Sequence, residues 1–256
     1  MITLLKVRIG TLDRFSSRLN SVRLGIISDL HANIHALRAV WKKFQDLHVT
    51  QIICLGDLVG YGATPDEVLR FVRENEVSTT MGSSEARLVF DLLTKEVRLG
   101  IADQTIEWSK TRLSTDDFKW MRALPMTGKM QTAHGRVRFM HGLPDDPDAK
   151  VDLADSQKNL NELLEKMNCQ IFITGGSHVP GVREVNQGFI INPGSVGLSL
   201  NGEPGADCAI LDFNGAKLRV ELYKVPYNFS AAAFDILTWD LPSVIADVIK
   251  NGSAKK

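Results

Sequence analysis

The chain has 256 residues, and its 30 lysines and arginines balance its 30 aspartates and glutamates, so the formal net charge is zero when the six histidines are neutral. Proteins that bind nucleic acid or anionic lipid over a broad surface usually carry a basic surplus, so we expect neither kind of partner. Hydrophobic residues make up 44% of the chain and charged residues 23%, which is typical of a globular protein and excludes the disordered and fibrous classes.

The cysteines and the apolar stretches indicate where in the cell the protein is expected. Cys54, Cys169 and Cys208 lie far apart and form no Cys-x-x-Cys pair, so neither a disulfide framework nor a thiolate zinc site is indicated. The longest apolar stretches have the length of a strand, far below the roughly 20 residues that span a bilayer. The sequence therefore predicts a cytoplasmic protein with no membrane partner.

The composition along the chain indicates one domain. Residues 1–21 are basic but lack the long apolar core of a secretory signal, and we interpret them as an N-terminal extension. Residues 22–252 contain no internal repeat, low-complexity tract or linker, which favours a single α/β domain with two sheet regions. Residues 253–256 are interpreted as a tail.

The first part of the chain alternates strands and helices. An apolar run at 22–28 predicts a buried strand, and Asn33 is a candidate N-cap for a helix whose apolar residues recur at three- and four-residue spacing as far as Phe44. Residues 51–55 repeat the pattern of a buried strand, and Pro65 marks the start of the next helix. The order so far is strand, helix, strand, helix, which is typical of an α/β domain.

The remainder is helical in the middle and rich in short strands towards the end. A strand is predicted at 77–81, the stretch 85–124 is predicted to be helical, and Ser114 and Asp117 form a capping box within it. Asn214-Gly215 is a hairpin turn signal. Further strands are predicted at 137–140, 170–174, 182–185, 189–192, 208–212 and 217–223, and further helices at 152–167, 231–237 and 244–249.

Polar motifs recur at the C-terminal ends of the predicted strands, where open α/β sheets build their ligand sites. Carboxylates combined with imidazoles suit Mn, Fe or Zn better than Ca. Each motif alone is weak, because a lone Asp-x-His is more often a capping Asp with a surface His. Their order on successive strand ends is what predicts a metal site. The motifs are Asp29-x-His31, Gly56-Asp57, Gly82-Ser83-Ser84-Glu85, His141-Gly142 and Gly175-Gly176-Ser177-His178.

In these motifs the sequence resembles the calcineurin-like metallophosphoesterase superfamily, and in particular its small bacterial phosphodiesterase branch. The segments 56–62, 192–197 and 225–227 also look like that branch. The resemblance implies a four-layer αββα sandwich, in which two mixed β-sheets are flanked by helices and a metal cleft lies at one sheet edge. It also implies hydrolysis of a phosphoester, because members of the family hold two metals about 3.5–4 Å apart that clamp the phosphoryl oxygens and activate the attacking water.

The resemblance assigns residues of this sequence to the two metals. The first metal would be held by Asp29, His31, Asp57 and His178, all of which are present. The second would share Asp57 and add His141 together with an Asn and a further His of the family pattern.

Three positions of the chain depart from that pattern. Ser83 stands where the family has the Asn, Ser84 where it has the His that supports the leaving oxygen, and Gly176 where it has the first His of the last motif. Gly176 offers no side-chain ligand, and a proton donor such as the one replaced by Ser84 typically contributes 10²–10⁴ in rate. We therefore expect one divalent cation per chain, Mn²⁺, Fe²⁺ or Zn²⁺, in preference to two.

Two functions follow from this reduced site. In the first, the chain is a metal-dependent phosphoesterase with Asp57 and His141 as catalytic residues, Glu85 or Asp145 assisting, and a small phosphorylated substrate. In the alternative, the chain is a catalytically inactive metallophosphoesterase-like binding or regulatory protein that keeps a structural metal. The acidic run 145–148 is expected to be a solvated loop in preference to a metal-adjacent one.

Overall fold

The computed structural model describes residues 23–90, 100–213 and 218–253. The expected N-terminal extension and the hairpin turn at 214–215 lie outside these residues, as does the tail from residue 254.

The first sheet carries the strands that begin the chain. β1 pairs in parallel with β2, and β2 with β3, whereas β9 runs antiparallel to both β1 and β10. Ile27 at the end of β1 lies opposite Cys54 at the end of β2, so the segments that follow both strands leave the sheet at the same edge. The strands are β1 (Arg23–Ile27), β2 (Gln51–Cys54), β3 (Ser78–Thr79), β9 (Ala206–Asp212) and β10 (Arg219–Val225), in the spatial order β10-β9-β1-β2-β3.

The second sheet brings two further motifs to one edge. β5 and β6 are parallel, and Met140 lies opposite Thr174, so His141 and Gly175 both follow strand ends at that edge. β4 was not predicted, because its sequence Thr-Gly-Lys-Met-Gln-Thr has a single buried side chain and no apolar run. The strands are β4 (Thr127–Thr132), β5 (Gly135–Met140), β6 (Ile171–Thr174), β7 (Gly181–Val185) and β8 (Gly188–Asn192), in the order β4-β5-β6-β8-β7.

The two sheets face each other across an apolar interior, and the alternation of side chains along β1 explains the packing. Leu24 and Ile26 point between the sheets and pack with residues of β5, β6 and β8. Gly25 faces the other way, against the ring of Phe44 in α1, where an added Cβ would lie 2.7 Å from the ring. A glycine here therefore lets α1 lie close against the sheet.

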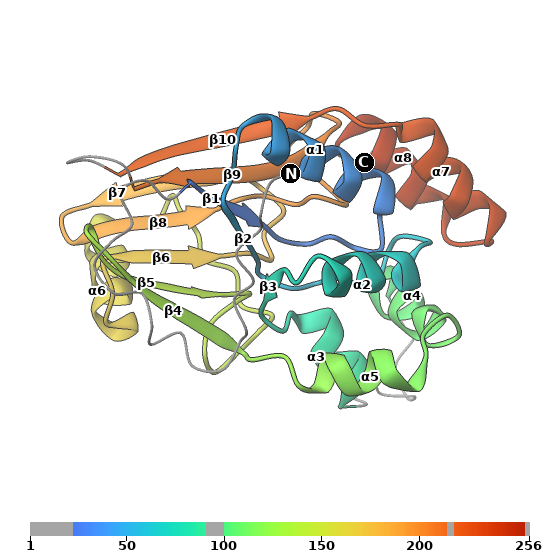
Figure 1. Cartoon of the computed structure of the whole chain (residues 1–256), viewed down its shortest axis with the longest axis horizontal. Coiled ribbons are helices and arrows are strands. Elements are labelled where there is room, and N and C mark those ends of the chain that lie inside the picture. The colour runs from blue at the N-terminus through green and yellow to red at the C-terminus, as the bar shows by residue number, and fades with distance from the viewer. Residues whose placement is uncertain (1–22, 91–99, 214–217, 254–256) are drawn as a thin grey trace.

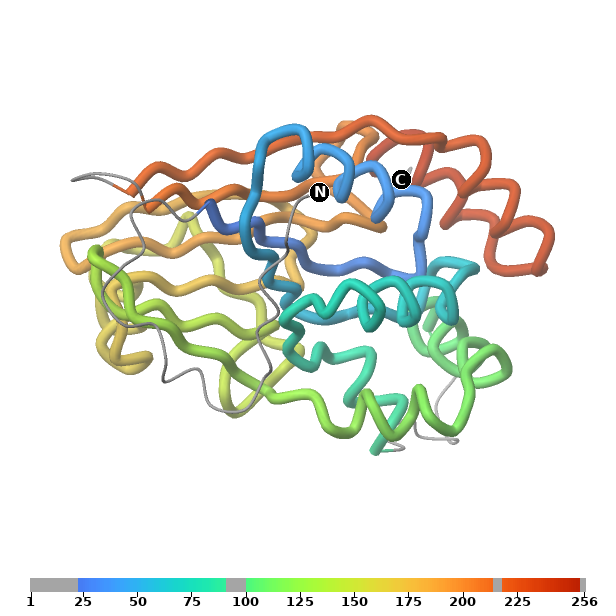
Figure 2. Tube along the Cα trace, viewed as in Figure 1, coloured from blue at the N-terminus to red at the C-terminus, as the bar shows by residue number. Residues whose placement is uncertain are grey.

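Helices cover the outer faces of the sheets, as Figures 1 and 2 show. α1 packs on the first sheet and α6 on the second, which confirms the predicted four-layer α/β sandwich with two mixed sheets. The helices are α1 (Ile34–Asp46), α2 (Pro65–Glu74), α3 (Ser83–Val89), α4 (Ile101–Lys110), α5 (Thr115–Arg122), α6 (Gln157–Met167), α7 (Phe229–Thr238) and α8 (Ser243–Asn251).

Local capping sets the helix boundaries. The Asn33 side chain accepts a hydrogen bond from the backbone N–H of Ala36 at 3.1 Å, and Ser114 forms its predicted box with Asp117. α6 begins at Gln157, capped by Ser156, and so starts five residues later than expected. The stretch predicted as helical from 85 to 124 contains three separate helices in its described part, α3, α4 and α5.

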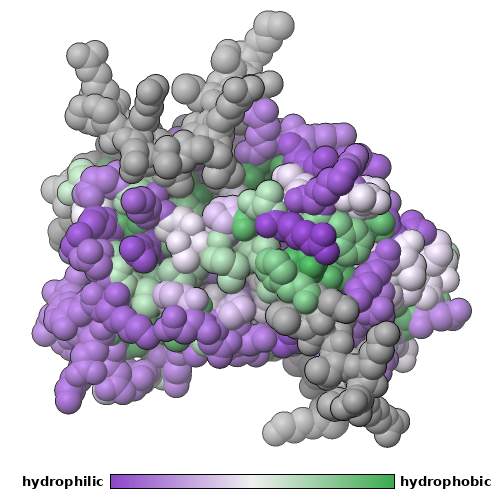
Figure 3. Space-filling view, turned by 90° about the horizontal axis from the view of Figure 1, so that it is seen from below, coloured by the Kyte–Doolittle hydropathy of each residue, from purple (hydrophilic) through white to green (hydrophobic). Residues whose placement is uncertain are grey.

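The face of the molecule on which α3 and α5 lie is shown in Figure 3, where an area of hydrophobic residues is bordered by hydrophilic ones. The exposed large hydrophobic side chains of the chain include Phe90, directly after α3, and Met126, just before β4. Among the residues that the structure describes, no helix has the length and apolar character needed to cross a membrane.

Glu85 joins the start of α3 to the loop that follows β2. Its carboxylate is fully buried and accepts four backbone N–H groups, from Asp57 at 2.9 Å, Leu58 at 2.7 Å, Val59 at 3.2 Å and Gly82 at 2.9 Å. Burial raises the pKa of Glu85 to about 7, with the Asp57 carboxylate acting in the same direction and the backbone donors opposing both. The glutamate therefore fixes the loop that carries Asp57.

Replacing Glu85 with glutamine should destabilise the fold. The amide would turn an N–H₂ group towards two backbone donors, and leaving buried donors without acceptors costs about 1–3 kcal/mol each. We expect Glu85→Gln to lower the free energy of unfolding by about 2–4 kcal/mol in urea titrations. Glu74→Gln, at an exposed position of α2, is the control and should change it by less than about 0.5 kcal/mol. Equal stabilities of the two variants would contradict this role of Glu85.

Candidate metal centre

Five side chains of the polar motifs come together at the shared edge of the two sheets. Asp29 and His31 follow β1, Asp57 follows β2, His141 follows β5 and His178 follows β6. All five are buried, with at most 7% of any residue exposed. Two groups of three among them have ligand atoms within 4.8 Å of one another, Asp29 with His31 and His178, and Asp29 with Asp57 and His141.

The backbone at these positions turns sharply as each strand ends. Asp29, His31, Asp57 and His178 have φ angles of 54°, 41°, 54° and 58°, in the left-handed region that non-glycine residues adopt only rarely. Hydrogen bonds between the loops hold this conformation, from the N–H of Asp29 to Gly56 O at 3.0 Å and from the N–H of His31 to Asp57 O at 2.9 Å. Such backbone strain is typical of functional sites, where the surrounding structure must enforce it.

His31 and His178 aim the same ring atom at Asp29. Their Nε2 atoms lie 3.0 Å apart, at 3.7 Å (His31) and 3.2 Å (His178) from Asp29 Oδ1. Each Nδ1 faces a backbone carbonyl, Val59 O at 3.2 Å for His31 and Leu198 O at 2.8 Å for His178.

These contacts are the ones expected at a cation-binding site. A carbonyl can only accept, so it selects the tautomer with the proton on Nδ1 and leaves the Nε2 lone pair free, which is how metal-binding histidines are oriented. Two such lone pairs then converge with Asp29 Oδ1, a fully buried atom with no hydrogen-bond partner among the described residues. A shared positive charge between the three atoms removes their mutual repulsion, so the donor set fits a divalent cation with nitrogen and oxygen ligands.

Asp57 and His141 complete the cluster on its other side. His141 Nε2 lies 3.4 Å from Asp57 Oδ2 and 3.9 Å from Asp29 Oδ1, and Asp57 Oδ2 lies 3.9 Å from His31 Nε2. The Nδ1 atom of His141 is buried and has no hydrogen-bond partner among the described residues, unlike those of His31 and His178. The ring of His141 is therefore the least constrained of the three.

The electrostatics of the cluster correspond to two buried negative charges. Burial acts to raise the pKa of Asp29, but the imidazoles of His178 and His141 outweigh it and hold the pKa at about 2. Burial acts to lower the pKa of His141, but the carboxylates of Asp57 and Asp29 raise it to about 10. The pKa of His31 falls to about 4 through burial and the neighbouring His178. The two carboxylates thus stay ionised and attract positive charge.

The three positions that depart from the family pattern surround Asp57 and His141. Ser83 Oγ lies 3.4 Å from each Asp57 carboxylate oxygen, and the backbone N–H of Ser84 donates to Asp57 Oδ1 at 2.8 Å. Gly176 donates its N–H to Asp29 Oδ2 at 3.1 Å, and a Cβ placed on it would lie 3.4 Å from His141 Nε2. A side chain at position 176 would therefore stand directly beside His141.

Glu85 and Asp145, which were expected to assist catalysis, do not place a free carboxylate in the cluster. The Glu85 carboxylate accepts the four backbone donors described above, and its help in catalysis stays a prediction. Asp145 has a side chain that is 84% exposed and lies 3.6 Å from Lys166 Nζ. Both contribute to the loops around the site.

Two residues near the centre escaped the sequence analysis. The ring of Tyr61 meets that of His31 edge to face, with centroids 4.7 Å apart. Arg87 lies one helical turn after Ser83 and Ser84. The helical spacing of Arg87 from these serines was the available signal, whereas nothing in the sequence indicated that Tyr61 faces an imidazole.

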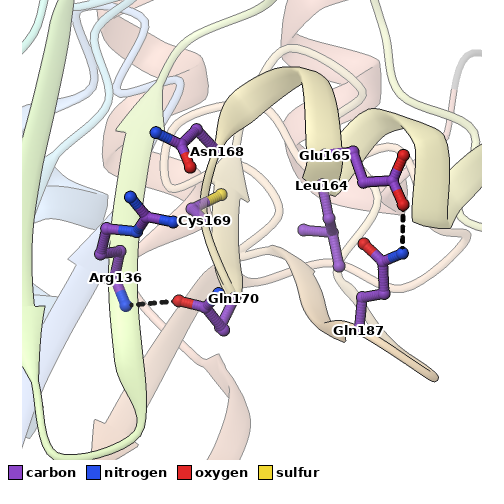
Figure 4. A pocket seen from close by; sticks show the side chains of 7 residues that line it. All are labelled: Arg136, Leu164, Glu165, Asn168, Cys169, Gln170 and Gln187. Atoms are coloured by element: carbon purple, nitrogen blue, oxygen red, sulfur yellow. Dashed lines mark hydrogen bonds between the residues drawn. The ribbon is translucent and has the colours of Figure 1, made fainter.

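A cavity of about 450 Å³ lies elsewhere, beside the C-terminal end of α6 (Figure 4). Arg136 in β5 and Gln170 before β6 belong to the opposite ends of these strands from His141 and Gly175. The backbone N–H of Arg136 donates to Gln170 Oε1 at 2.8 Å across the cavity wall. The cavity is therefore separate from the five-residue cluster.

Known proteins share both the sequence pattern and the fold. Residues 22–216 match the model of the calcineurin-like phosphoesterase superfamily domain. An uncharacterized protein of Methanocaldococcus jannaschii is 27% identical over 247 residues, covering 88% of this chain and 96% of that protein.

Two solved structures are similar over 91% of this chain and the whole of the other chain. A metallophosphoesterase from Sphaerobacter thermophilus is 25% identical with a TM-score of 0.73, and a hypothetical protein from Pyrococcus horikoshii is 18% identical with a TM-score of 0.82, which shows the fold. Since the family model spans most of the residues, the chain belongs to the calcineurin-like phosphoesterase superfamily.

Proposed function

We propose that the chain is a metal-dependent phosphoesterase that holds one divalent cation, Mn²⁺, Fe²⁺ or Zn²⁺, and hydrolyses a small phosphorylated substrate. The observation that carries the proposal is the convergence of His31 Nε2, His178 Nε2 and Asp29 Oδ1, with both Nδ1 atoms bound to carbonyls. The cation would be held by Asp29, His31, Asp57 and His178.

The missing ligands support one cation over two. The two possible ligand groups share Asp29, whose Oδ1 lies within 3.9 Å of the Nε2 atoms of all three histidines. Ser83, next to Asp57, offers only a neutral hydroxyl, and Gly176, next to His141, offers no side chain. A second cation would have Asp29, Asp57 and His141 as its side-chain ligands, one fewer than the four of a closed tetrahedral site.

The residues around the cation divide the chemistry between them. A divalent cation supplies a Lewis acid for a phosphoryl oxygen and lowers the pKa of an attacking water. Asp57 orients the cluster through its contacts with Ser84 N–H and His141. With one cation bound, His141 would keep a proton on Nε2 and give it to the leaving oxygen. Ser84 cannot do this, because it stands where the family has a histidine.

The alternative is a metal-holding binding or regulatory protein without turnover. It is favoured by the replacement of the supporting His by Ser84 and by the missing ligand at Gly176. The two functions differ in their need for His141, because only an enzyme requires a group that moves a proton. An activity assay therefore separates them.

Hydrolysis of an activated phosphodiester with Mn²⁺ in excess should depend on two residues in different ways. Asp57→Ala should lose both activity and tightly bound metal, since it removes a ligand. His141→Gln should keep one metal per chain but turn over about 10²–10⁴ times more slowly, since it removes the proton donor. If the wild type and Asp57→Ala were equally inactive across metals and pH, the enzymatic function would be contradicted in favour of the alternative.

Restoring the family ligands should rebuild a second metal position. The variant Ser83→Asn, Ser84→His and Gly176→His supplies the amide oxygen and imidazoles that the chain lacks, next to His141. Position 176 has φ of 75°, which strains any side chain, but His178 in the same loop already tolerates 58°. We expect metal content to rise towards two per chain, measured by elemental analysis, with higher activity. A folded variant that still binds one metal would refute this account.

A further inference from the structure

Arg87 leaves α3 on the side that faces the metal cluster. Ser83 and Ser84, at the start of the same helix, contact the Asp57 carboxylate through a hydroxyl at 3.4 Å and a backbone N–H at 2.8 Å. Residues three and four positions apart lie on one helix face, and Arg87 is fourth after Ser83 and third after Ser84. Burial acts to lower the pKa of the guanidinium, but the carboxylates of Asp148, Asp103 and Asp57 together raise it.

The partners of Arg87 come from segments that border the candidate centre. Its Nη1 donates to Asp103 Oδ1 at 3.0 Å, and its Nη2 lies 2.8 Å from both carboxylate oxygens of Asp148. Asp103 precedes Thr105, whose hydroxyl oxygen accepts the N–H of Tyr61, and Asp148 lies in the loop that follows His141. The guanidinium thus lies between the loop of Tyr61 and the loop of His141.

Asp148 is an exchangeable partner. Its side chain is 49% exposed, and ion pairs at this exposure contribute little to stability. A guanidinium binds carboxylate and phosphoryl oxygens with the same N–H donors, and a phosphoryl group carries more oxygens to share. A phosphorylated ligand at the cluster can therefore displace Asp148 at small cost.

We propose that Arg87 is a substrate-binding residue that takes a phosphoryl oxygen on the side of the cluster where second-metal ligands are missing, with Asp148 occupying the guanidinium until the substrate arrives. The inference rests on the proposed function, since it presupposes a phosphorylated ligand at the cation. A guanidinium held in place by Asp103 supplies fixed positive charge where charge builds up on the phosphoryl group. Arg87 would thereby substitute for part of what a second cation contributes.

Binding of inorganic phosphate to the metal-loaded full chain tests the proposal without requiring turnover. By isothermal titration at about 0.15 M salt, which screens distant charges, Arg87→Gln should weaken phosphate binding about tenfold or more, since it removes a charge-assisted contact. Asp148→Asn should tighten it about threefold or more, because the competing carboxylate is gone. The double variant should resemble Arg87→Gln, since Asp148 acts only through Arg87.

Two controls separate this role from charge and from stability. Asp145→Asn removes the same charge from the same loop without touching Arg87, and should leave phosphate affinity unchanged. Asp117→Asn breaks a comparable ion pair, Arg73 Nη1 to Asp117 Oδ1 at 2.7 Å, between α2 and α5, and should also leave it unchanged. Thermal unfolding identifies variants that fail to fold, and Arg87→Lys then replaces Arg87→Gln.

The outcomes are distinct from those of the activity assay. Equal phosphate affinity in wild type, Arg87→Gln and Asp148→Asn would overturn the inference and leave Arg87 as a structural link between α3, α4 and the 143–149 loop. A wild type that binds no phosphate would overturn it as well. An active enzyme with that result would keep the proposed function. Arg87-dependent phosphate binding without turnover would instead uphold the inference and contradict the enzymatic function.

Discussion

The two buried carboxylates of Asp29 and Asp57 impose the constraint on which the rest of the site depends. Charges removed from water must be paired, and these two face three imidazole nitrogens within 3.9 Å. Two of those imidazoles are fixed by backbone carbonyls with their lone pairs turned inward. The positive-φ turns at the strand ends and the four backbone hydrogen bonds to the buried Glu85 hold this arrangement, whose negative charge a divalent cation would balance.

The zero net charge of the chain acquires a meaning from this arrangement. A divalent cation would balance the two acids of the cluster, and the nearby guanidinium of Arg87 is paired with Asp103 and Asp148. These charges are balanced locally within a neutral chain, as suits the proposed small phosphorylated ligand held by short contacts in preference to a long polyanion.

Strand-end motifs in the sequence predicted the fold and brought the five polar residues to one edge, because apolar runs and caps such as Asn33 are local signals. The features that the sequence did not predict depend on contacts between residues far apart in the chain. β4 is stabilised by pairing with β5, and its own residues gave no apolar pattern. The hydrogen bonds that the Glu85 carboxylate accepts from the loop after β2 were not predicted either, because they join residues 26–28 positions apart. The position of Tyr61 beside His31 depends on how the loop after β2 folds, and no local pattern in the sequence indicates it, whereas Arg87 follows Ser83 and Ser84 at helical spacing.

One divalent cation should satisfy the cluster, and the metal content of the protein purified without chelator measures this. Elemental analysis counted per chain should give one Mn, Fe or Zn, with binding lost in Asp29→Ala and kept in Asp145→Asn, whose side chain lies outside the cluster. Two tightly bound metals per chain, or one metal that stays bound in Asp29→Ala, would contradict a single cation held by this cluster.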